Sequence, residues 1–145
     1  MSFLFKKICI ASDHAGFDLK EKIKDFLINK YVSIIDLGPI RKKSVDYPDY
    51  ARKLAYRIKG KKSDVGILVC GSGTGMAISA NKIKNIRAAV CYNRKSTRLS
   101  RQHNNANIIA LGARLTKKSM SLKLVELFLK TKFEGGRHLK RIKKI

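Results

Sequence analysis

Residues 64–76 read DVGILVCGSGTGM, and this stretch decides the fold. Val65–Val69 is a short apolar run rich in β-branched side chains, which is typical of a buried strand. Gly71–Gly75 follows as a loop with no side chain larger than threonine, and Met76–Lys82 then has the character of a helix. A strand, a glycine loop and a helix in succession point unpaired backbone N–H groups at one place, where they can bind an anion.

Cys70 stands where this strand ends and the glycine loop begins. Backbone N–H groups and a helix N-terminus favour the thiolate, which is the reactive form of cysteine. The alternative is a buried cysteine that ends a strand beside a tight turn. The spacing G-x-G-x-G is neither the fingerprint of dinucleotide folds nor a P-loop. A small phosphorylated ligand therefore fits this loop better than a nucleotide does.

Short apolar runs alternate with helical periodicities along the rest of the chain. Further strands are predicted at Ile8–Ala11, Val32–Leu37, Arg87–Cys91 and Asn107–Leu111. Helices are predicted at Phe17–Lys30, from Pro48 to about Ile58, at Lys95–Gln102 and at Ser119–Lys130, with a turn at Lys59–Ser63. Five strands alternating with helices indicate a single α/β domain over residues 1–145, a three-layer, doubly wound (Rossmann-like) sheet of five parallel strands.

The carboxyl ends of the strands are where such sheets bind ligands, at the point where the strand order reverses. A flavodoxin-like order places the first and third strands side by side, which brings Asp13 and His14 next to the glycine loop. Asp13 can equally be a turn residue that caps the following helix. Two unusual loops that meet at the expected place favour a binding site over two unrelated turns.

The net charge of the chain is +23 over 145 residues, of which 44% are hydrophobic. This length and hydrophobic content suffice for one domain with its own core. The charge would suit a nucleic-acid-binding protein, but no nucleic-acid-binding motif is present. The abundance of Lys, Ile and Asn favours a general compositional bias, so we expect no specific nucleic-acid binding.

The three cysteines, Cys9, Cys70 and Cys91, lie far apart and form no CxxC pair. This pattern argues against a disulfide framework or a zinc site and indicates a reducing compartment. The apolar run at the start is too short for a signal peptide, and no stretch approaches the length of a membrane span. We expect a cytoplasmic protein that does not enter membranes.

Six motifs are spread over the chain. They are ASDHAGF at 11–17, VDYPDY at 45–50, ILVCGSG at 67–73, RQHN at 101–104, LGAR at 111–114 and FEGGRH at 133–138. Together they closely resemble ribose-5-phosphate isomerases of the B type, in the family that also holds galactose-6-phosphate and allose-6-phosphate isomerases. The resemblance covers essentially the whole chain.

The resemblance implies an aldose–ketose isomerase that interconverts ribose 5-phosphate and ribulose 5-phosphate through an enediolate, in the pentose phosphate pathway, with no metal and no cofactor. It implies that Cys70 moves the proton between C1 and C2, that Ser72 donates from its hydroxyl, and that His103 opens the sugar ring. The implied substrate-binding positions are Asp13, His14, Tyr47, Gly71, Ser72, Gly73, Thr74, Gly75, Asn104, Arg114, Arg137 and Arg141.

At two positions this chain differs from some members of the family. Some members use a Glu in the glycine-loop segment as the base, where this chain has Met76, so the chain resembles the cysteine type. Many members have Thr where Ser72 stands, and serine keeps the hydroxyl. An isomerase of six-carbon sugar phosphates is the alternative function. A nucleic-acid-binding protein on this scaffold is more remote, because Cys70 and His103 are both retained.

His103 and Cys70 are expected at opposite edges of the sheet. His103 precedes the fifth strand and so lies at the amino edge, whereas Cys70 ends the third strand at the carboxyl edge. A strand of about six residues spans roughly 20 Å, but acid–base catalysis needs contact near ~3 Å. We therefore predict that His103 and Asn104 enter the site of a neighbouring subunit, in a homodimer or a dimer of dimers.

The tail at residues 131–145 is expected to pack at the active site or at the dimer interface. Arg137 and Arg141 lie four positions apart, so in a helix they share one face and can grip a phosphate together. The alternative is a solvated basic tail.

Overall fold

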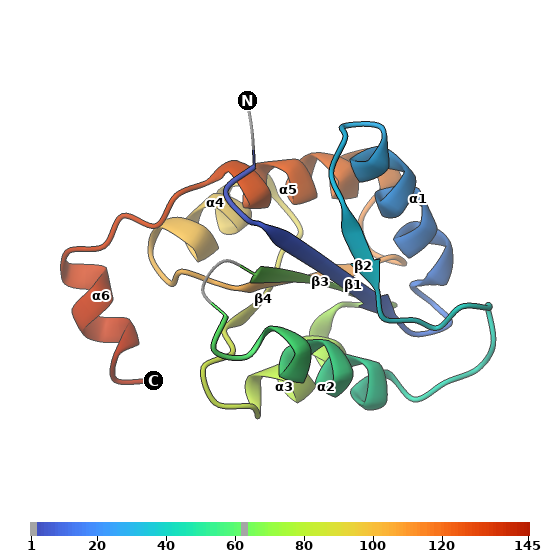
Figure 1. Ribbon diagram of the computed structural model, residues 1–145, viewed down its shortest axis with the longest axis horizontal. Coiled ribbons are helices and arrows are strands. Elements are labelled where there is room, and N and C mark those ends of the chain that lie inside the picture. Colours follow the sequence, from blue (N-terminus) through green and yellow to red (C-terminus); the bar gives the residue numbers. More distant parts are fainter. Residues whose placement is uncertain (1–2, 62–63) are drawn as a thin grey trace.

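The computed structural model describes residues 3–61 and 64–145. Figure 1 shows one sheet between two layers of helices, with α1, α4 and α5 on one face and α2 and α3 on the other. The strands are β1 (Lys7–Ser12), β2 (Ile34–Asp36), β3 (Asp64–Cys70), β4 (Ala88–Val90) and β5 (Ile108–Gly112). The helices are α1 (Phe17–Ile28), α2 (Tyr47–Ile58), α3 (Thr74–Asn81), α4 (Arg94–Gln102), α5 (Lys118–Lys130) and α6 (Arg137–Ile142). The predicted fold class is confirmed.

The core consists of two apolar clusters, one on each face of the sheet. Ile8 and Ile10 of β1 face the cluster with α1 and α5, whereas Cys9 and Ala11 face the cluster with α2. Every described residue of β3 is buried, as is all of β5. Burial on both faces explains why these strands appear in the sequence as continuous apolar runs rather than as alternating patterns.

The strand order is β2-β1-β3-β5-β4, and all pairings are parallel. The prediction that the first and third strands are neighbours is confirmed. The flavodoxin-like order is wrong beyond them, because β5 lies between β3 and β4. The fully buried β5 belongs in the interior, whereas the three residues of β4 are only partly buried and suit an edge.

The predicted helix and strand boundaries agree with the structure to within a few residues. The two edge strands, β2 and β4, are shorter than predicted because each pairs with a single neighbour. The turn predicted at Lys59–Ser63 is described only as far as Lys61, and Lys62 and Ser63 lie outside the described residues. Within the described ranges, no helix combines the length and apolar character that crossing a bilayer requires.

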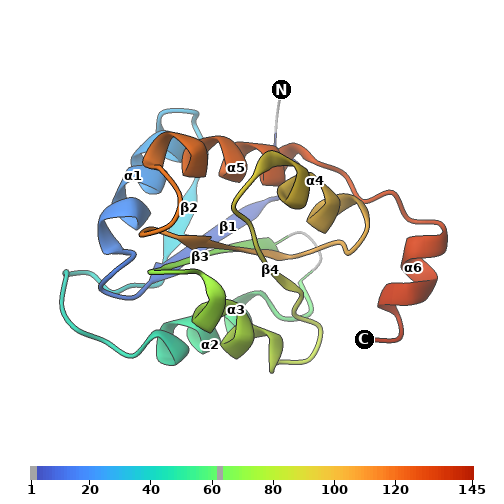
Figure 2. The same ribbon diagram turned by 180° about the vertical axis from the view of Figure 1, so that it is seen from behind.

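The C-terminal helix stands apart from the body of the molecule. Figures 1 and 2 show α6 beyond the end of the sheet where β1 begins, opposite the loop that follows the arrowhead of β1. The tail is helical over Arg137–Ile142, and both Arg137 and Arg141 are exposed. The tail is therefore attached to the amino edge of its own sheet.

Candidate active site

Cys70 is the last residue of β3 and is only 5% exposed. The backbone N–H of Gly73 donates a hydrogen bond to Cys70 Sγ at 3.1 Å. Gly73 precedes α3 with a φ of 80°, and a Cβ atom there would lie 3.1 Å from the backbone of Leu111. Glycine is therefore needed at this position both for its backbone conformation and for its lack of a side chain. The result is a sulfur atom held against the start of a helix.

The loop after β1 is fastened to the end of β3. The Asp13 N–H donates to the Val69 carbonyl at 3.2 Å, and the Asp13 carboxylate accepts from the Gly16 N–H at 3.0 Å. Asp13 thus stabilises its own turn, but it does not cap α1, because its carboxylate binds the N–H of Gly16 before the helix begins. The Val45 N–H donates to His14 Nδ1 at 3.4 Å, so a neutral His14 carries its proton on Nε2. His14 can then donate that proton to a ligand.

The glycine loop also contacts segments from elsewhere in the chain. A Cβ atom on Gly75 would lie 2.5 Å from the ring of Tyr47, and one on Gly71 would lie 3.3 Å from Arg114 Nη1. The Arg114 N–H donates to the Gly71 carbonyl at 3.0 Å. Ser72 is exposed, and its hydroxyl accepts from the Thr74 N–H at 3.3 Å. The loops after β1, β3 and β5 and the start of α2 therefore meet around Cys70.

Four of the predicted site residues do not join this group within one chain. His103 and Asn104 lie between α4 and the start of β5, while Arg137 and Arg141 lie on α6. Because Cys70 pairs with Gly112 at the far end of β5, these four residues lie at the opposite edge of the sheet. The remaining predicted residues are assembled at the carboxyl edge: Asp13, His14, Tyr47, Cys70, Gly71, Ser72, Gly73, Thr74, Gly75 and Arg114.

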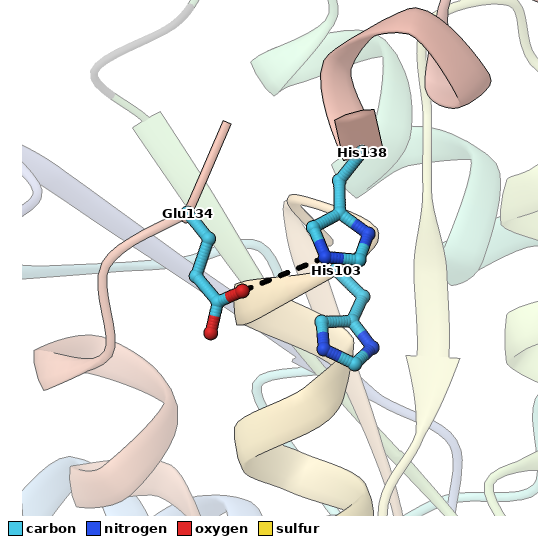
Figure 3. Close-up of side chains that lie close together, drawn as sticks. All are labelled: His103, Glu134 and His138. Atoms are coloured by element: carbon cyan, nitrogen blue, oxygen red, sulfur yellow. Dashed lines mark ion pairs between the residues drawn. The ribbon is translucent and has the colours of Figure 1, made fainter. Parts of the chain in front are cut away.

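The amino edge contains a second group of polar side chains that lie close together. The His103 and His138 rings are stacked with centroids 4.2 Å apart and planes at 12°. His138 Nε2 lies 3.5 Å from a Glu134 carboxylate oxygen, as Figure 3 shows. Burial and the neighbouring positive groups, including His103 and Arg137, lower the pKa of His138. Glu134 and His138 stand in the FEGGRH motif, but the sequence assigned no role to either.

Two arginines hold the segment that carries His103. Buried Arg101 donates to the Ala106 carbonyl at 2.6 Å, to Asn105 Oδ1 at 2.9 Å and to the Thr131 carbonyl at 3.1 Å. Arg87 Nε donates to the Asn104 carbonyl at 3.0 Å. Burial, with the charge of Arg87, lowers the pKa of Arg101 to about 10. Sequence reasoning missed this anchor, although Arg101 begins the RQHN motif.

Comparison with known proteins identifies the class that this fold and site define. The family described as ribose/galactose isomerase matches residues 8–145. Ribose-5-phosphate isomerase B of Escherichia coli is 42% identical to this chain, over 97% of this chain and 94% of its own length. The chain belongs to the ribose/galactose isomerase family.

Two solved structures show the same fold over nearly the whole chain. A ribose 5-phosphate isomerase from Thermotoga maritima has a TM-score of 0.92 and 50% identity, with 95% of each chain covered. Ribose-5-phosphate isomerase B from Mycoplasma genitalium, with bound ribulose-5-phosphate, has a TM-score of 0.92 and 44% identity, covering 95% of this chain and 92% of its own. This chain is accordingly an enzyme of the isomerase class.

Proposed function

We propose that this chain interconverts ribose 5-phosphate and ribulose 5-phosphate. The observation that carries the proposal is the Cys70 sulfur at the carboxyl edge, held by the Gly73 N–H at the start of α3. The relative from Mycoplasma genitalium that carries ribulose-5-phosphate supports the choice of a five-carbon sugar. We place the reaction in the pentose phosphate pathway and in the cytoplasm.

Cys70 is the group that we expect to move the proton. In the open-chain sugar it takes the proton from C2 of the aldose and returns it to C1 of the ketose. The Gly73 N–H is directed at this sulfur, and cysteine acts as a base in its thiolate form. The negative charge that develops on the enediolate oxygens needs fixed donors. The Gly73 and Thr74 N–H groups already donate to Cys70 Sγ and Ser72 Oγ, so we expect the Ser72 hydroxyl and the remaining N–H groups of the glycine loop to serve as these donors.

The phosphate group needs cationic and N–H donors at the other end of the sugar. His14 lies on the loop after β1 and has its Nε2 proton free for donation once Nδ1 accepts from Val45. Arg137 and Arg141 share the exposed side of α6 and present two guanidinium groups. Binding energy from the phosphate then positions C1 and C2 against Cys70.

Each active site is proposed to contain residues from two subunits. His103, Asn104, Arg137 and Arg141 lie at the amino edge, while Cys70 lies at the carboxyl edge. A twofold dimer can join the amino edge of one subunit to the carboxyl edge of the other, and do so twice. The smallest active unit would then be a homodimer, alone or within a dimer of dimers.

Substitution of the three cysteines tests the base. Cys70→Ala should lower turnover of ribose 5-phosphate by at least about a thousandfold, since the proton acceptor is lost. Cys9→Ala and Cys91→Ala are matched controls, because both thiols are buried in the core and should leave turnover nearly unchanged. Assays with ribose, allose and galactose phosphates side by side decide the substrate. Higher kcat/KM for a six-carbon phosphate would overturn the pentose proposal.

Mixing two inactive variants tests the shared site. Cys70→Ala and His103→Ala proteins should each be nearly inactive on the cyclic sugar. After subunit exchange, a mixed dimer has one site with both residues intact and one site with neither. Activity should therefore return in proportion to the mixed dimer, quantified by native mass spectrometry. Mixed dimers as inactive as their parents would contradict the arrangement.

A further inference from the structure

Three side chains with metal-binding atoms lie together at the junction of α4 and the C-terminal tail. His103 follows α4, Glu134 precedes α6, and His138 belongs to α6. One ligand atom from each residue lies within 4.8 Å of the other two. Figure 3 shows one nitrogen of each stacked imidazole on the side of the Glu134 carboxylate. The ligand atoms of the three groups therefore lie on one side of the cluster, although the two ring planes are nearly parallel.

Two imidazoles and one carboxylate are a donor set suited to Zn²⁺. With metal–ligand bonds of about 2.0–2.2 Å, two ligand atoms around a tetrahedral ion lie roughly 3.3–3.5 Å apart. The 3.5 Å separation of His138 Nε2 and the Glu134 oxygen already meets this distance. Glu134 is 48% exposed and His103 is partly exposed, so both side chains have room to rotate. The His103 ring must tilt out of its stack with His138 for both imidazole nitrogens to point at one ion.

The backbone that carries these side chains is held in place without a metal. The Glu134 N–H donates to the carbonyl of Gln102, at the end of α4, at 3.1 Å. Arg101 in turn donates to the carbonyl of Thr131 at 3.1 Å. The tail is therefore fastened to α4 at Thr131 and at Glu134, and the ligands are close together before any ion binds.

The surrounding charge narrows the choice of metal. Arg137 and Arg141 lie on the same short helix as His138, and the chain as a whole has a net charge of +23. Hard cations such as Mg²⁺ bind mainly through carboxylate charge and water, so this environment disfavours them. Zn²⁺ and its neighbours form strong bonds to neutral imidazole and tolerate a single carboxylate.

We propose that His103, Glu134 and His138 form a binding site for Zn²⁺ or a similar divalent transition metal, and that metal bound there inhibits the isomerase. The inhibitory half rests on the proposed function, in which His103 opens the sugar ring. A His103 nitrogen that is bonded to a metal cannot give or accept a proton. Metal bound at this site therefore inhibits the isomerase reaction.

Metal titration of tag-free, chelator-treated protein tests the site directly. Calorimetry should show one Zn²⁺ per chain and no binding of Mg²⁺. Titration with Co²⁺ should give visible absorption bands of a nitrogen- and oxygen-bonded ion. A near-ultraviolet thiolate-to-cobalt band would mark a cysteine ligand instead. Such a band, if absent from Cys70→Ala but unchanged in Glu134→Gln and His138→Gln, would place the metal on Cys70 rather than on the three proposed ligands and overturn the proposal.

Matched substitutions locate the ligands. Glu134→Gln and His138→Gln should each weaken Zn²⁺ binding by at least about tenfold, because even loss of a group that only supports a ligand costs roughly 10- to 100-fold. Asp49→Asn is the control, since it removes an exposed carboxylate on α2. Wild-type protein that binds no Zn²⁺, or Glu134→Gln that binds it equally well, would also overturn the site.

Inhibition is measured separately from binding. Zn²⁺ should reversibly inhibit turnover of ribose 5-phosphate by the wild type, and a chelator should restore it. Half-inhibition of Glu134→Gln should need at least about ten times more Zn²⁺, while Asp49→Asn should match the wild type. Stoichiometric binding without inhibition would overturn the inhibitory half. If no sugar phosphate is turned over, the proposed function fails, while calorimetry still decides the metal site.

Discussion

The two edges of the sheet are built in different ways. At the carboxyl edge, a Cβ atom added to Gly16 or Gly112 would lie within 3 Å of the backbone of Val69 or Ser72. At the amino edge, nothing lies within 4 Å of such an atom on Gly135 or Gly136. A cavity of about 680 Å³ there is lined by residues from α4, α6 and the strand starts, among them Arg101, Leu139 and Asp64.

Because of this difference, we expect the carboxyl-edge half of the proposed site to be rigid and the amino-edge half to be adaptable. Proton transfer at carbon needs fixed donors, and the carboxyl edge supplies them as backbone N–H groups between closely packed loops. In the proposed reaction, phosphate binding and ring opening rely on the amino edge, which supplies long side chains on a loop and a six-residue helix. The open amino edge is also the part that a partner subunit can complete.

The largest loss of stability is expected when a side chain is added to a glycine at the carboxyl edge. A Cβ atom at Gly16 would lie 2.1 Å from the Val69 carbonyl oxygen, so Gly16→Ala must move backbone. We expect the free energy of unfolding to fall by about 3 kcal/mol or more. Gly135→Ala is the matched change at the amino edge, where only its φ of 68° opposes a side chain, at about 1–2 kcal/mol. Urea denaturation of both variants measures the contrast, and equal losses would contradict it.

The second-largest loss of stability is expected from disrupting a buried ion pair near the carboxyl edge. Lys20, with no exposed side-chain surface, lies 2.6 Å from Asp36, and Lys24 lies 2.7 Å from the same oxygen. The other Asp36 oxygen accepts from the Gly38 N–H at 2.8 Å, which fixes the loop after β2. Asp36→Asn should cost about 2–4 kcal/mol at neutral pH, because Lys20 loses its main partner.

The stability that Asp36 contributes depends on pH. Burial alone would raise the pKa of Asp36, but hydrogen bonds from Lys20 and Lys24 outweigh it and hold the pKa below its usual value. The contribution is therefore complete above the unfolded pKa, near ~3.9, and is lost as the pH falls through the folded pKa. Denaturation at pH 7 and pH 3 should show the gap between wild type and Asp36→Asn narrowing in acid. An unchanged gap would refute the linkage.

Arg101 stabilises the amino edge of the sheet, as Asp36 stabilises the carboxyl edge. Arg101→Met would leave three oxygen acceptors without their donor and should cost about 2–3 kcal/mol. Because the Asn105 and Ala106 acceptors adjoin His103, turnover should also fall. Arg98→Met, at an exposed position of the same helix, is the control and should change stability by less than about 0.5 kcal/mol. Thermal unfolding and steady-state kinetics measure the two effects.

The sequence was sufficient to predict the fold class and that the loops after β1 and β3 meet at the carboxyl edge. Buried strands such as β3 have apolar runs that no surface segment shares, and the loops after β1 and β3 follow from adjacent parallel strands. The placement of β5 between β3 and β4 has no local signal, because it depends on which strand buries more surface in the finished sheet. The position of β5 is therefore determined only when the strands and helices pack together.

Side-chain partnerships at the amino edge were beyond sequence reasoning for a similar reason. Arginine is mostly exposed in proteins, so the burial of Arg101 runs against the expectation for its residue type. The stacking of His103 on His138 joins residues from different elements, and no periodicity connects them. Motif membership marked these positions, but only the folded chain shows which of them touch.

The smallest effect on stability is expected for the exposed arginines of α6. The side chains of Arg137 and Arg141 make no hydrogen bond or ion pair that the structure records among the described residues. Arg137→Ala and Arg141→Ala should therefore each change the free energy of unfolding by less than about 0.5 kcal/mol. Their effect should appear in the kinetics, chiefly as a higher KM for ribose 5-phosphate with some loss of kcat, because phosphate contacts bind and position the sugar. Lys140→Ala, which removes a neighbouring exposed charge, should leave KM close to that of the wild type if specific contacts rather than general charge are responsible. Equal kinetics in all three variants would show that α6 is a solvated basic tail, and the amino edge would then lack its phosphate-binding role.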